Sequence, residues 1–553
     1  MKHIFKKAGI ICCIVLTIIS CSKKIDDVYT NPNADIKVPP EELLPQIISA
    51  MGGNYAGHGP MNDIRYIGAY IQNFSFYLGG SAFDRMGYNN NDIAQSIWRV
   101  HYYDIGQNNQ RMMEWAAEQG KWEYVAAGKA IEAWSWLVLT DYHDNVVLKE
   151  AFNTSLISFK YDKQEEVFAH VKKLAMESLE NFEKVPGNSS ANLAKGDAYF
   201  YNGDISKWKK FANGILARVY HRYSNKTSLY KPDSVIHYAN LAMQDYMDDA
   251  TVKFVASNNS PTNNFLGPFR NNLTGTGTTN PTAIRQSTYI VNLLKGSNSA
   301  FTGVTDPRAI YMLRLNTAGT FVGVEPIKGE AIIANDQTPE SFWGLSQNPS
   351  PTNVNNGGQG VLPRYVFRND APFPVMTASE IHFLKAEAYF LKGEKGNALN
   401  SYREGIRENM EMLKSPSWNV NIPADKEITQ GVIDNFLANT AVVPTDPAQL
   451  KLSMIMLQKY ISLFVHGVLE TWVDMRRYHY IDADPSGTGQ VYADFVPPQG
   501  SDLWPANNGE LVYRYYPRFN SEYVWNILEL QRIGATATNY HSNTQEKIWF
   551  AIP

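Results

Sequence analysis

Apolar residues along most of the chain recur every three or four positions, which is the spacing of one face of an α-helix. Two such faces are Val167, Val171 and Leu174, and Trp208, Phe211, Ile215 and Val219. Asp162 with Glu165 predicts an N-terminal cap for the first of these helices. A long helical pattern also extends from about 450 to 478. The sequence therefore predicts an all-α fold.

The clearest pair of helices lies between residues 377 and 414. Thr377-Ala378-Ser379-Glu380 has the form of a capping box, and Gly393 is placed to end the helix that follows it. The inner faces of the two helices carry Ile381, Leu384, Ala388 and Leu391, then Ala398, Tyr402, Ile406 and Leu413. Such a hairpin resembles a tetratricopeptide repeat, and segments 122–141 and 162–184 predict a second pair. We expect tetratricopeptide-like helix pairs to form one scaffold with long irregular loops.

Two segments interrupt the helical pattern. In 257–282, 21 of 26 residues are Asn, Gly, Pro, Ser or Thr, and in 346–360 the count is 12 of 15. Loops of this length inside a compact domain are usually functional. We expect a loop-rich insertion at about 250–375 to carry the ligand-binding surface.

The N-terminal segment has the pattern of an export signal. Three lysines among the first seven residues precede an uncharged run from Ala8 to Ile19. A helix this short does not cross a hydrocarbon layer of about 30 Å, so we interpret residues 1–20 as a signal peptide. Ser before Cys21 resembles a bacterial lipobox and predicts acylation of Cys21; an ordinary cleaved signal is the alternative. We expect residues 21–40 to form a tether and residues 41–553 to form the domain.

Composition excludes some classes of function. The 553 residues carry 50 Lys+Arg and 54 Asp+Glu, and 44% are hydrophobic, which indicates a packed core and argues against a nucleic-acid binder. The eleven histidines are scattered, and no phosphate-binding or metalloprotease motif is present in the sequence. Residues 482–487 resemble the start of a calcium loop, but Ala493 stands where a ligand glutamate is needed. We expect no cofactor and no metal.

Glu470 and Asp474 are the most suggestive carboxylate pair. They are four residues apart, so both lie on the same face of a predicted helix. A retaining glycosidase needs two carboxyl groups this close together. Arg476 and Arg477 follow within a turn, which favours a salt-bridge network instead. We therefore predict that the protein is not an enzyme.

Several blocks of sequence together resemble the SusD/RagB family, the surface nutrient-capture lipoproteins of Bacteroidetes, and within it the SusD-like subgroup. The two most specific blocks are Asp197…Tyr201-Asn-Gly203-Asp204…Trp208…Arg218 and Gln458-Lys459-Tyr460…Gly467…Glu470…Trp472…Asp474…Arg476-Arg477. The region after Thr140-Asp141 departs from the family pattern at Asp144, Val147 and Leu148. Helical spacing places Trp208, Phe211 and Trp472 in the core and Arg218 and Arg476 in ion pairs.

The resemblance implies an outer-membrane lipoprotein, anchored through Cys21, that faces the cell exterior. It also implies a TonB-dependent (SusC-like) transporter as the partner, an oligosaccharide or other nutrient as the ligand, and no nucleic-acid partner. A peptide-capturing member of the same family and an all-α glycoside hydrolase are the alternatives. A plain tetratricopeptide scaffold would not need the long polar loops.

A site for sugars needs exposed aromatic rings that cover the C–H face of a pyranose, with amides and charged groups beside them. Two stretches of sequence offer this combination. The first comprises Tyr77, Phe83, Arg85, Tyr88 and Asn90. The second comprises Asn263, Phe265, Phe269, Arg270 and Trp343. Trp98 borders the first stretch, and its helical spacing predicts a place in the core.

Overall fold

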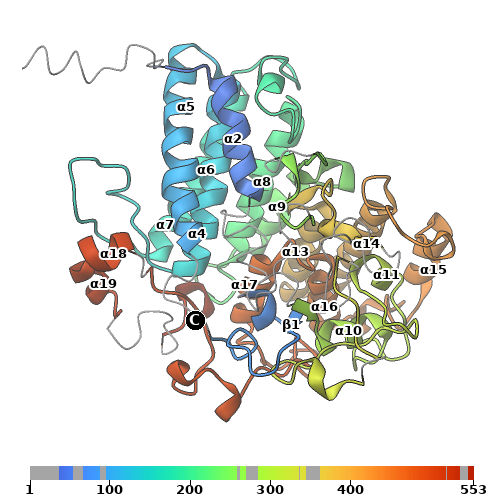
Figure 1. Ribbon diagram of the computed structural model, residues 1–553. Helices are drawn as coiled ribbons and strands as arrows, with labels where there is room; N and C mark the ends of the chain where they lie inside the picture. Colours follow the sequence, from blue (N-terminus) through green and yellow to red (C-terminus); the bar gives the residue numbers. More distant parts are fainter. Residues whose placement is uncertain are drawn as a thin grey trace, which may run out of the picture.

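The computed structural model in Figure 1 shows a layer of long helices beside a second, loop-rich body of shorter helices. The residues that the structure describes are 37–53, 67–87, 95–257, 262–268, 284–334, 337–343, 362–487, 489–517, 520–535 and 546–553. Outside them lie residues 1–20, which are predicted to be a signal peptide, most of both polar loops, Cys21, Tyr88, Asn90, Phe269 and Arg270. The described elements are mainly helical, which confirms the all-α prediction.

The first half of the chain forms helices of different lengths. They are α2 Pro40–Gly52, α4 Gln95–Arg99, π-helix η2 Val100–Gln107, α5 Asn108–Glu118, α6 Trp122–His143, α7 Gln164–Phe182, α8 Ile205–His221 and α9 Pro232–Leu241. Of these, α2, α5 and α6 lie side by side (Figure 1). The predicted pair at 122–141 and 162–184 is confirmed as α6 and α7. The predicted cap of α7 is wrong by one residue, because Glu166 accepts from the Lys163 N–H while Asp162 accepts from Leu148 and Lys149.

The second half contains α10 Thr288–Lys295, α11 Ala309–Met312, α13 Ala378–Leu391, α14 Lys395–Lys414, α15 Gln430–Ala438, α16 Leu452–Ser462, α17 Val468–Arg477, α18 Asn520–Trp525 and α19 Ile527–Arg532. The hairpin of α13 and α14 is confirmed: the Thr377 hydroxyl accepts from the Glu380 N–H, and Gly393 lies at φ +85° after α13. The single helix predicted at 450–478 is instead broken between α16 and α17. Val465 takes a φ of +70° there, and its N–H donates to the Asn73 side chain.

Short elements join these helices. Strand β1 Phe74–Phe76 pairs antiparallel with β3 Ile284–Gln286, and β2 Ala250–Val252 pairs antiparallel with β4 Phe373–Met376. The 3-10 turns are η3 Leu193–Lys195, η4 Tyr246–Asp248, η7 Glu330–Ile332, η9 Tyr365–Phe367, η10 Ala424–Lys426, η11 Pro447–Gln449, η12 Gly500–Asp502, η13 Pro505–Asn507 and η14 Trp549–Ala551. In the described part of the chain, no helix has both the length and the apolar character needed to cross a membrane.

A buried network of charged side chains connects α6, α8, α13, α16 and α17. Its ion pairs are Arg218–Glu380 (2.5 Å), Arg222–Asp141 (2.9 Å), Arg222–Glu470 (2.6 Å), Lys459–Asp474 (2.7 Å), Arg477–Asp474 (2.7 Å) and Arg477–Glu387 (2.8 Å). Each partner is at most 2% exposed, so both carboxylates of the sequence pair are neutralised inside the scaffold, as the salt-bridge interpretation expected. The ion pair expected for Arg476 is wrong: it donates to the carbonyl oxygens of Trp472, Asp141 and Tyr513.

Candidate functional site

The second predicted cluster does not form an exposed platform. Phe265 and Trp343 are each 1% exposed, and Asn263 is fully buried. The Phe265 ring packs against Phe373, and the Trp343 indole N–H donates to the Leu266 carbonyl at 2.6 Å. The expectation that these rings face solvent is therefore wrong. A loop with few apolar residues gains most by burying them, and these side chains fasten the described part of the loop to the core.

The first cluster is also used for structure. Phe83 is 3% exposed and packs on Phe76, which corrects the expectation of an exposed ring. Tyr77 and Arg85 are partly exposed. The Arg85 guanidinium donates to the carbonyl oxygens of Ser501, Asp502 and Leu503, at 2.8, 3.2 and 3.0 Å respectively. Arg85 thus holds the 501–503 turn in place beside a cavity.

We name this cavity the loop hollow. It has a volume of about 500 Å³ and lies among four segments: the chain around β1, helix α10, residues 325–328 and residues 494–502. Its lining residues are Gln72, Asp84, Thr288, Tyr289, Asn292, Asn298, Glu325, Pro326, Ile327, Lys328, Asp494, Val496, Pro497, Pro498, Gln499 and Asp502. Amide and carboxyl groups alternate with prolines and one tyrosine ring, so the lining offers both hydrogen bonds and apolar surface.

Hydrogen bonds between the segments fix the walls of the loop hollow. The Asp84 carboxylate accepts from the N–H groups of Phe76 and Ile327, each at 3.1 Å. Burial raises the pKa of Asp84 to about 7. The Gln72 amide donates to the Val496 carbonyl at 2.7 Å, which joins the first segment to the last. The hollow is therefore preformed by cross-links between distant parts of the sequence.

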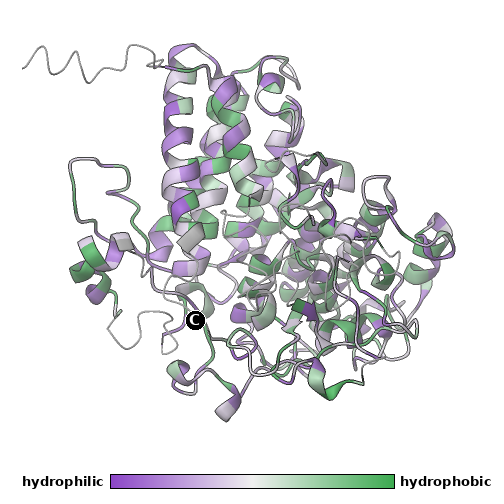
Figure 2. Cartoon of the chain, viewed as in Figure 1, coloured by the Kyte–Doolittle hydropathy of each residue, from purple (hydrophilic) through white to green (hydrophobic). Residues whose placement is uncertain are grey.

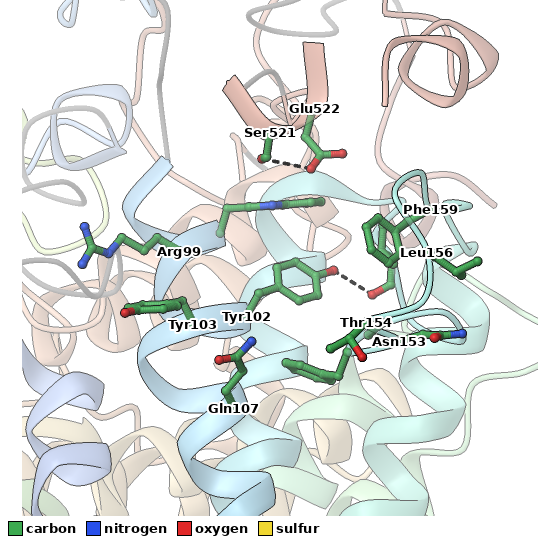
Figure 3. Close-up of a pocket in the computed structure, with 14 residues that line it drawn as sticks. Arg99, Tyr102, Tyr103, Gln107, Asn153, Thr154, Leu156, Phe159, Ser521 and Glu522 are labelled. Atoms are coloured by element: carbon green, nitrogen blue, oxygen red, sulfur yellow. Dashed lines mark hydrogen bonds between the residues drawn. The ribbon is translucent and has the colours of Figure 1, made fainter. Parts of the chain in front are cut away.

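A second cavity of similar size, the aromatic groove, lies where η2 meets the 147–159 loop and α18 (Figure 3). Its lining residues are Trp98, Arg99, Tyr102, Tyr103, Gln107, Val147, Ala151, Phe152, Asn153, Thr154, Leu156, Phe159, Ser521 and Glu522. Tyr103 is 61% exposed, with the Arg99 guanidinium 5.5 Å from its ring centroid. The Tyr102 hydroxyl donates to the Val147 carbonyl at 2.7 Å. The aromatic groove is thus a largely apolar cavity whose walls carry aromatic rings.

The π-helix η2 gives the aromatic groove its shape. A side chain at Gly106 would lie 2.5 Å from the Phe152 ring and 2.4 Å from the His101 carbonyl oxygen, so only glycine allows this close approach. π-helical turns are rare and occur frequently at functional sites. At the α18 side, burial raises the pKa of Glu522, which accepts from the Tyr161 hydroxyl and the Asn526 amide.

Sequence reasoning missed most of both cavities. The aromatic run from Trp98 to Tyr103 was a usable signal for the groove. The prediction of a core position for Trp98 is confirmed, since it is 8% exposed, and the same side chain also lines the groove. No signal in the sequence joins residues near 72, 290, 326 and 498. Among the described residues, no group of three or more His, Cys, Asp or Glu side chains is arranged to hold a metal ion. The Asp484 carboxylate accepts from the N–H groups of Ser453 and Ser486 instead.

Comparison with known proteins identifies the family. Residues 32–498 match the model of the SusD-like family, described as starch-binding and associating with the outer membrane. The chain belongs to the SusD-like family. No curated protein matches it. The match includes all lining residues of the loop hollow except Gln499 and Asp502, whereas Ser521 and Glu522 of the aromatic groove lie beyond it.

Solved structures share the fold. A SusD homolog from Bacteroides fragilis has a TM-score of 0.68 at 17% identity, covering 93% of this chain and 100% of its own. A SusD/RagB family protein from Bacteroides thetaiotaomicron has a TM-score of 0.65 at 18% identity, covering 93% and 99%. A structure named as a chitin-binding protein has a TM-score of 0.64 at 21% identity, covering 93% and 100%. These solved structures thus have the same fold as this chain, whose family is described as starch-binding and associated with the outer membrane.

Proposed function

We propose that the protein captures oligosaccharides in the loop hollow and delivers them to a TonB-dependent outer-membrane transporter. The observation that carries the proposal is the lining of the hollow, where amides and carboxyls alternate with Pro326, Pro497, Pro498 and the Tyr289 ring. Sugar hydroxyls exchange hydrogen bonds with the polar groups, and the C–H faces of the rings contact the apolar ones. The family description and the chitin-binding relative agree with a glycan ligand.

We propose binding without cleavage. The conspicuous acids of the scaffold, Glu470 and Asp474, are buried and held by arginine and lysine partners. Arg218 and Arg222 lower the pKa of Glu470 to about 2 against the opposing effect of its burial, so this carboxyl does not act as a proton donor near neutral pH. The protein then releases its ligand unchanged.

In this proposal the N-terminal segment anchors the protein to the membrane and lets it pass its ligand to the transporter. An acylated Cys21 would hold the protein on the outer face of the membrane. Between Cys21 and Lys37 the chain has 16 residue steps, which extend to roughly 55 Å at most. A tether of that reach lets the body move over a membrane-embedded partner without leaving the membrane.

The partner surface in this proposal is the face that carries the aromatic groove. Tyr103 is 61% exposed, Ile157 84%, Trp525 70% and Leu528 76%. Figure 2 shows hydrophobic residues on α18 and α19, which project from the side of the helical layer. Exposed aromatic and aliphatic groups around a pocket, with Arg99 beside them, are typical of protein interfaces. The groove and the hollow share no lining residue, so ligand and transporter can be bound at the same time.

Calorimetric titration of residues 22–553 with a panel of oligosaccharides tests the capture site. Asn292→Ala and Gln499→Ala each remove an amide from the loop hollow and should weaken binding about fivefold, because one hydrogen bond contributes about 1 kcal/mol. Gln119→Ala, at the exposed end of α5, is the matched control. Unchanged affinity in both hollow variants contradicts the site. Release of reducing ends from a bound glycan contradicts the proposal that the protein only binds.

A further inference from the structure

The charges around the loop hollow are strongly unequal. Among the described residues that line it, four carry carboxyl groups, namely Asp84, Glu325, Asp494 and Asp502, and one, Lys328, carries a positive charge. Nearby Arg85 does not line the hollow, and its guanidinium donates to three backbone carbonyls. Burial raises the pKa of Asp84 to about 7, so this carboxyl is largely uncharged at pH 6. The three other acids still outnumber Lys328, which makes the hollow a region of negative potential that attracts cations and repels anions.

The arrangement of these acids does not suit a metal ion. Glu325, Asp494 and Asp502 are exposed; Glu325 lies in residues 325–328, whereas Asp494 and Asp502 lie at the two ends of residues 494–502. Asp494 accepts from the N–H and hydroxyl of Ser299, and the buried Asp84 accepts from two backbone N–H groups. Metal sites need several oxygen atoms converging within about 2.6 Å of one point. In the described part of the chain, no group of three or more such side chains converges in this way. Spread along a rim, the carboxylates match positive charges that are distributed along an extended organic ligand.

Tyr289 supplies a second, independent observation. It forms part of the wall of the hollow, is 5% exposed, and packs between Tyr460 and Phe495. Its hydroxyl has no hydrogen-bond partner among the described residues. Burial raises the pKa of this phenol, with Tyr460 and Asp494 adding to the effect, so the hydroxyl keeps its proton. A buried hydroxyl without a protein partner is uncommon in native proteins, and in the wall of the hollow it is a hydrogen-bonding group that a ligand can use.

We infer that the loop hollow selects oligosaccharides that carry protonated primary amines, such as glucosamine oligomers, over neutral and acidic oligosaccharides. The inference rests on the proposed function, because it names the class of sugar bound at the same site. Ammonium groups gain from the carboxylate rim and donate hydrogen bonds to it, and the sugar rings contact the proline and tyrosine surfaces. Uronic acid oligomers meet the same rim with like charge.

The test compares glucosamine, N-acetylglucosamine and galacturonic acid tetramers by calorimetry at pH 6. The expected result is that the glucosamine tetramer binds at least fivefold more tightly than the acetylated one, about 1 kcal/mol, and the galacturonic acid tetramer binds more weakly than both. Raising the salt concentration to 0.5 M should reduce this ratio, since exposed charges are screened. Equal affinities for the amine and acetylated tetramers overturn the inference.

Two sets of charge-removing substitutions distinguish the effect of the acids at the loop hollow from the effect of the net charge of the protein. The triple variant Glu325→Gln, Asp494→Asn, Asp502→Asn should bring the amine-to-acetyl ratio close to one. The control Glu118→Gln, Glu183→Gln, Asp233→Asn changes the net charge equally at exposed positions outside the hollow and should keep the ratio. Loss of the preference in the control overturns the inference.

Failure of the inference and failure of the proposed function give different results. If neutral oligosaccharides bind at the hollow without preference for amines, only the selectivity is wrong. If no oligosaccharide of any charge binds, the proposed function is wrong and the inference falls with it. A lysine tetrapeptide that binds more tightly than the glucosamine tetramer overturns the assignment to sugars, because both ligands carry the same protonated amine.

Discussion

The loop hollow and the aromatic groove have similar volumes but are built in different ways. The hollow lies among loops, is lined by amides and carboxyls, and is closed by hydrogen bonds such as Gln72 to Val496. The groove lies on a π-helix, and its lining combines five aromatic rings with polar and charged side chains such as Arg99, Gln107 and Glu522. Cavity size alone does not distinguish a sugar site from a partner site. The chemistry of the lining does, since sugars need many hydrogen bonds and protein partners need apolar contact.

The largest expected effect concerns the buried charge network that supports both regions. Glu470→Gln leaves Arg222 paired with Asp141 and Arg218 paired with Glu380, and it should lower the free energy of unfolding by about 3 kcal/mol, because a buried charge-assisted hydrogen bond to Arg222 is lost. Asp233→Asn removes an exposed pair with Lys392 and should change stability by less than about 0.5 kcal/mol. Chemical denaturation measures both. Equal stability of the two variants would show that the network does not support the scaffold.

The lowered pKa of Glu470 also predicts that the free energy of unfolding depends on pH. The pKa of Glu470 is lowered from 4.5 to about 2 in the folded protein, since Arg218 and Arg222 outweigh the effect of burial. On acidification the unfolded chain therefore takes up this proton first. The stabilisation is complete above about pH 4.5 and is lost as the pH falls toward 2. Urea denaturation between pH 5 and 2 should show a smaller loss of stability in Glu470→Gln than in the parent, and parallel curves would contradict the assignment.

Substitutions confined to the face that carries the aromatic groove test whether the proposed transporter and the oligosaccharide bind at separate places. If the proposed transporter binds this face, Trp525→Ser with Leu528→Ser should weaken that binding by about 2 kcal/mol or more, because exposed tryptophan often dominates an interface. Oligosaccharide affinity at the hollow should stay constant. Ile332→Ser, at a residue with 62% exposure in another part of the chain, is the matched control. Co-purification with the transporter measures the effect, and loss of sugar binding in the double variant would show that the groove face binds the ligand.

A smaller effect is expected from filling the space at the π-helix. Gly106→Ala places a methyl group against the Phe152 ring and the His101 carbonyl, which should cost about 1–3 kcal/mol of stability and displace the groove wall. Oligosaccharide binding at the hollow should be unaffected. Gly396→Ala, where the added carbon meets open space, serves as the control. Thermal unfolding and calorimetry on the same samples measure both properties, and a fully stable Gly106→Ala would contradict the close packing.

Local sequence patterns predicted the helix pairs because their signals lie within one segment, as at Thr377 and Gly393. They did not predict the break at Val465, whose N–H donates a hydrogen bond to the side chain of Asn73, a residue almost 400 positions earlier in the sequence. Polar loops suggested exposed rings, but Phe265 and Trp343 are buried, because apolar side chains pack inward even from a polar segment. Arg85 was predicted to bind ligand, and in the structure its guanidinium donates to the carbonyl oxygens of residues 501–503 beside the loop hollow.

Hydrogen–deuterium exchange at saturating oligosaccharide tests the central distinction most directly, since protection reports which backbone segments a ligand contacts or orders. The account predicts slower exchange in residues 325–328 and 494–502, with no change in residues 98–107 and 147–159. Protection of the second pair of segments, with the first pair unchanged, would place the captured ligand in the aromatic groove and contradict the account.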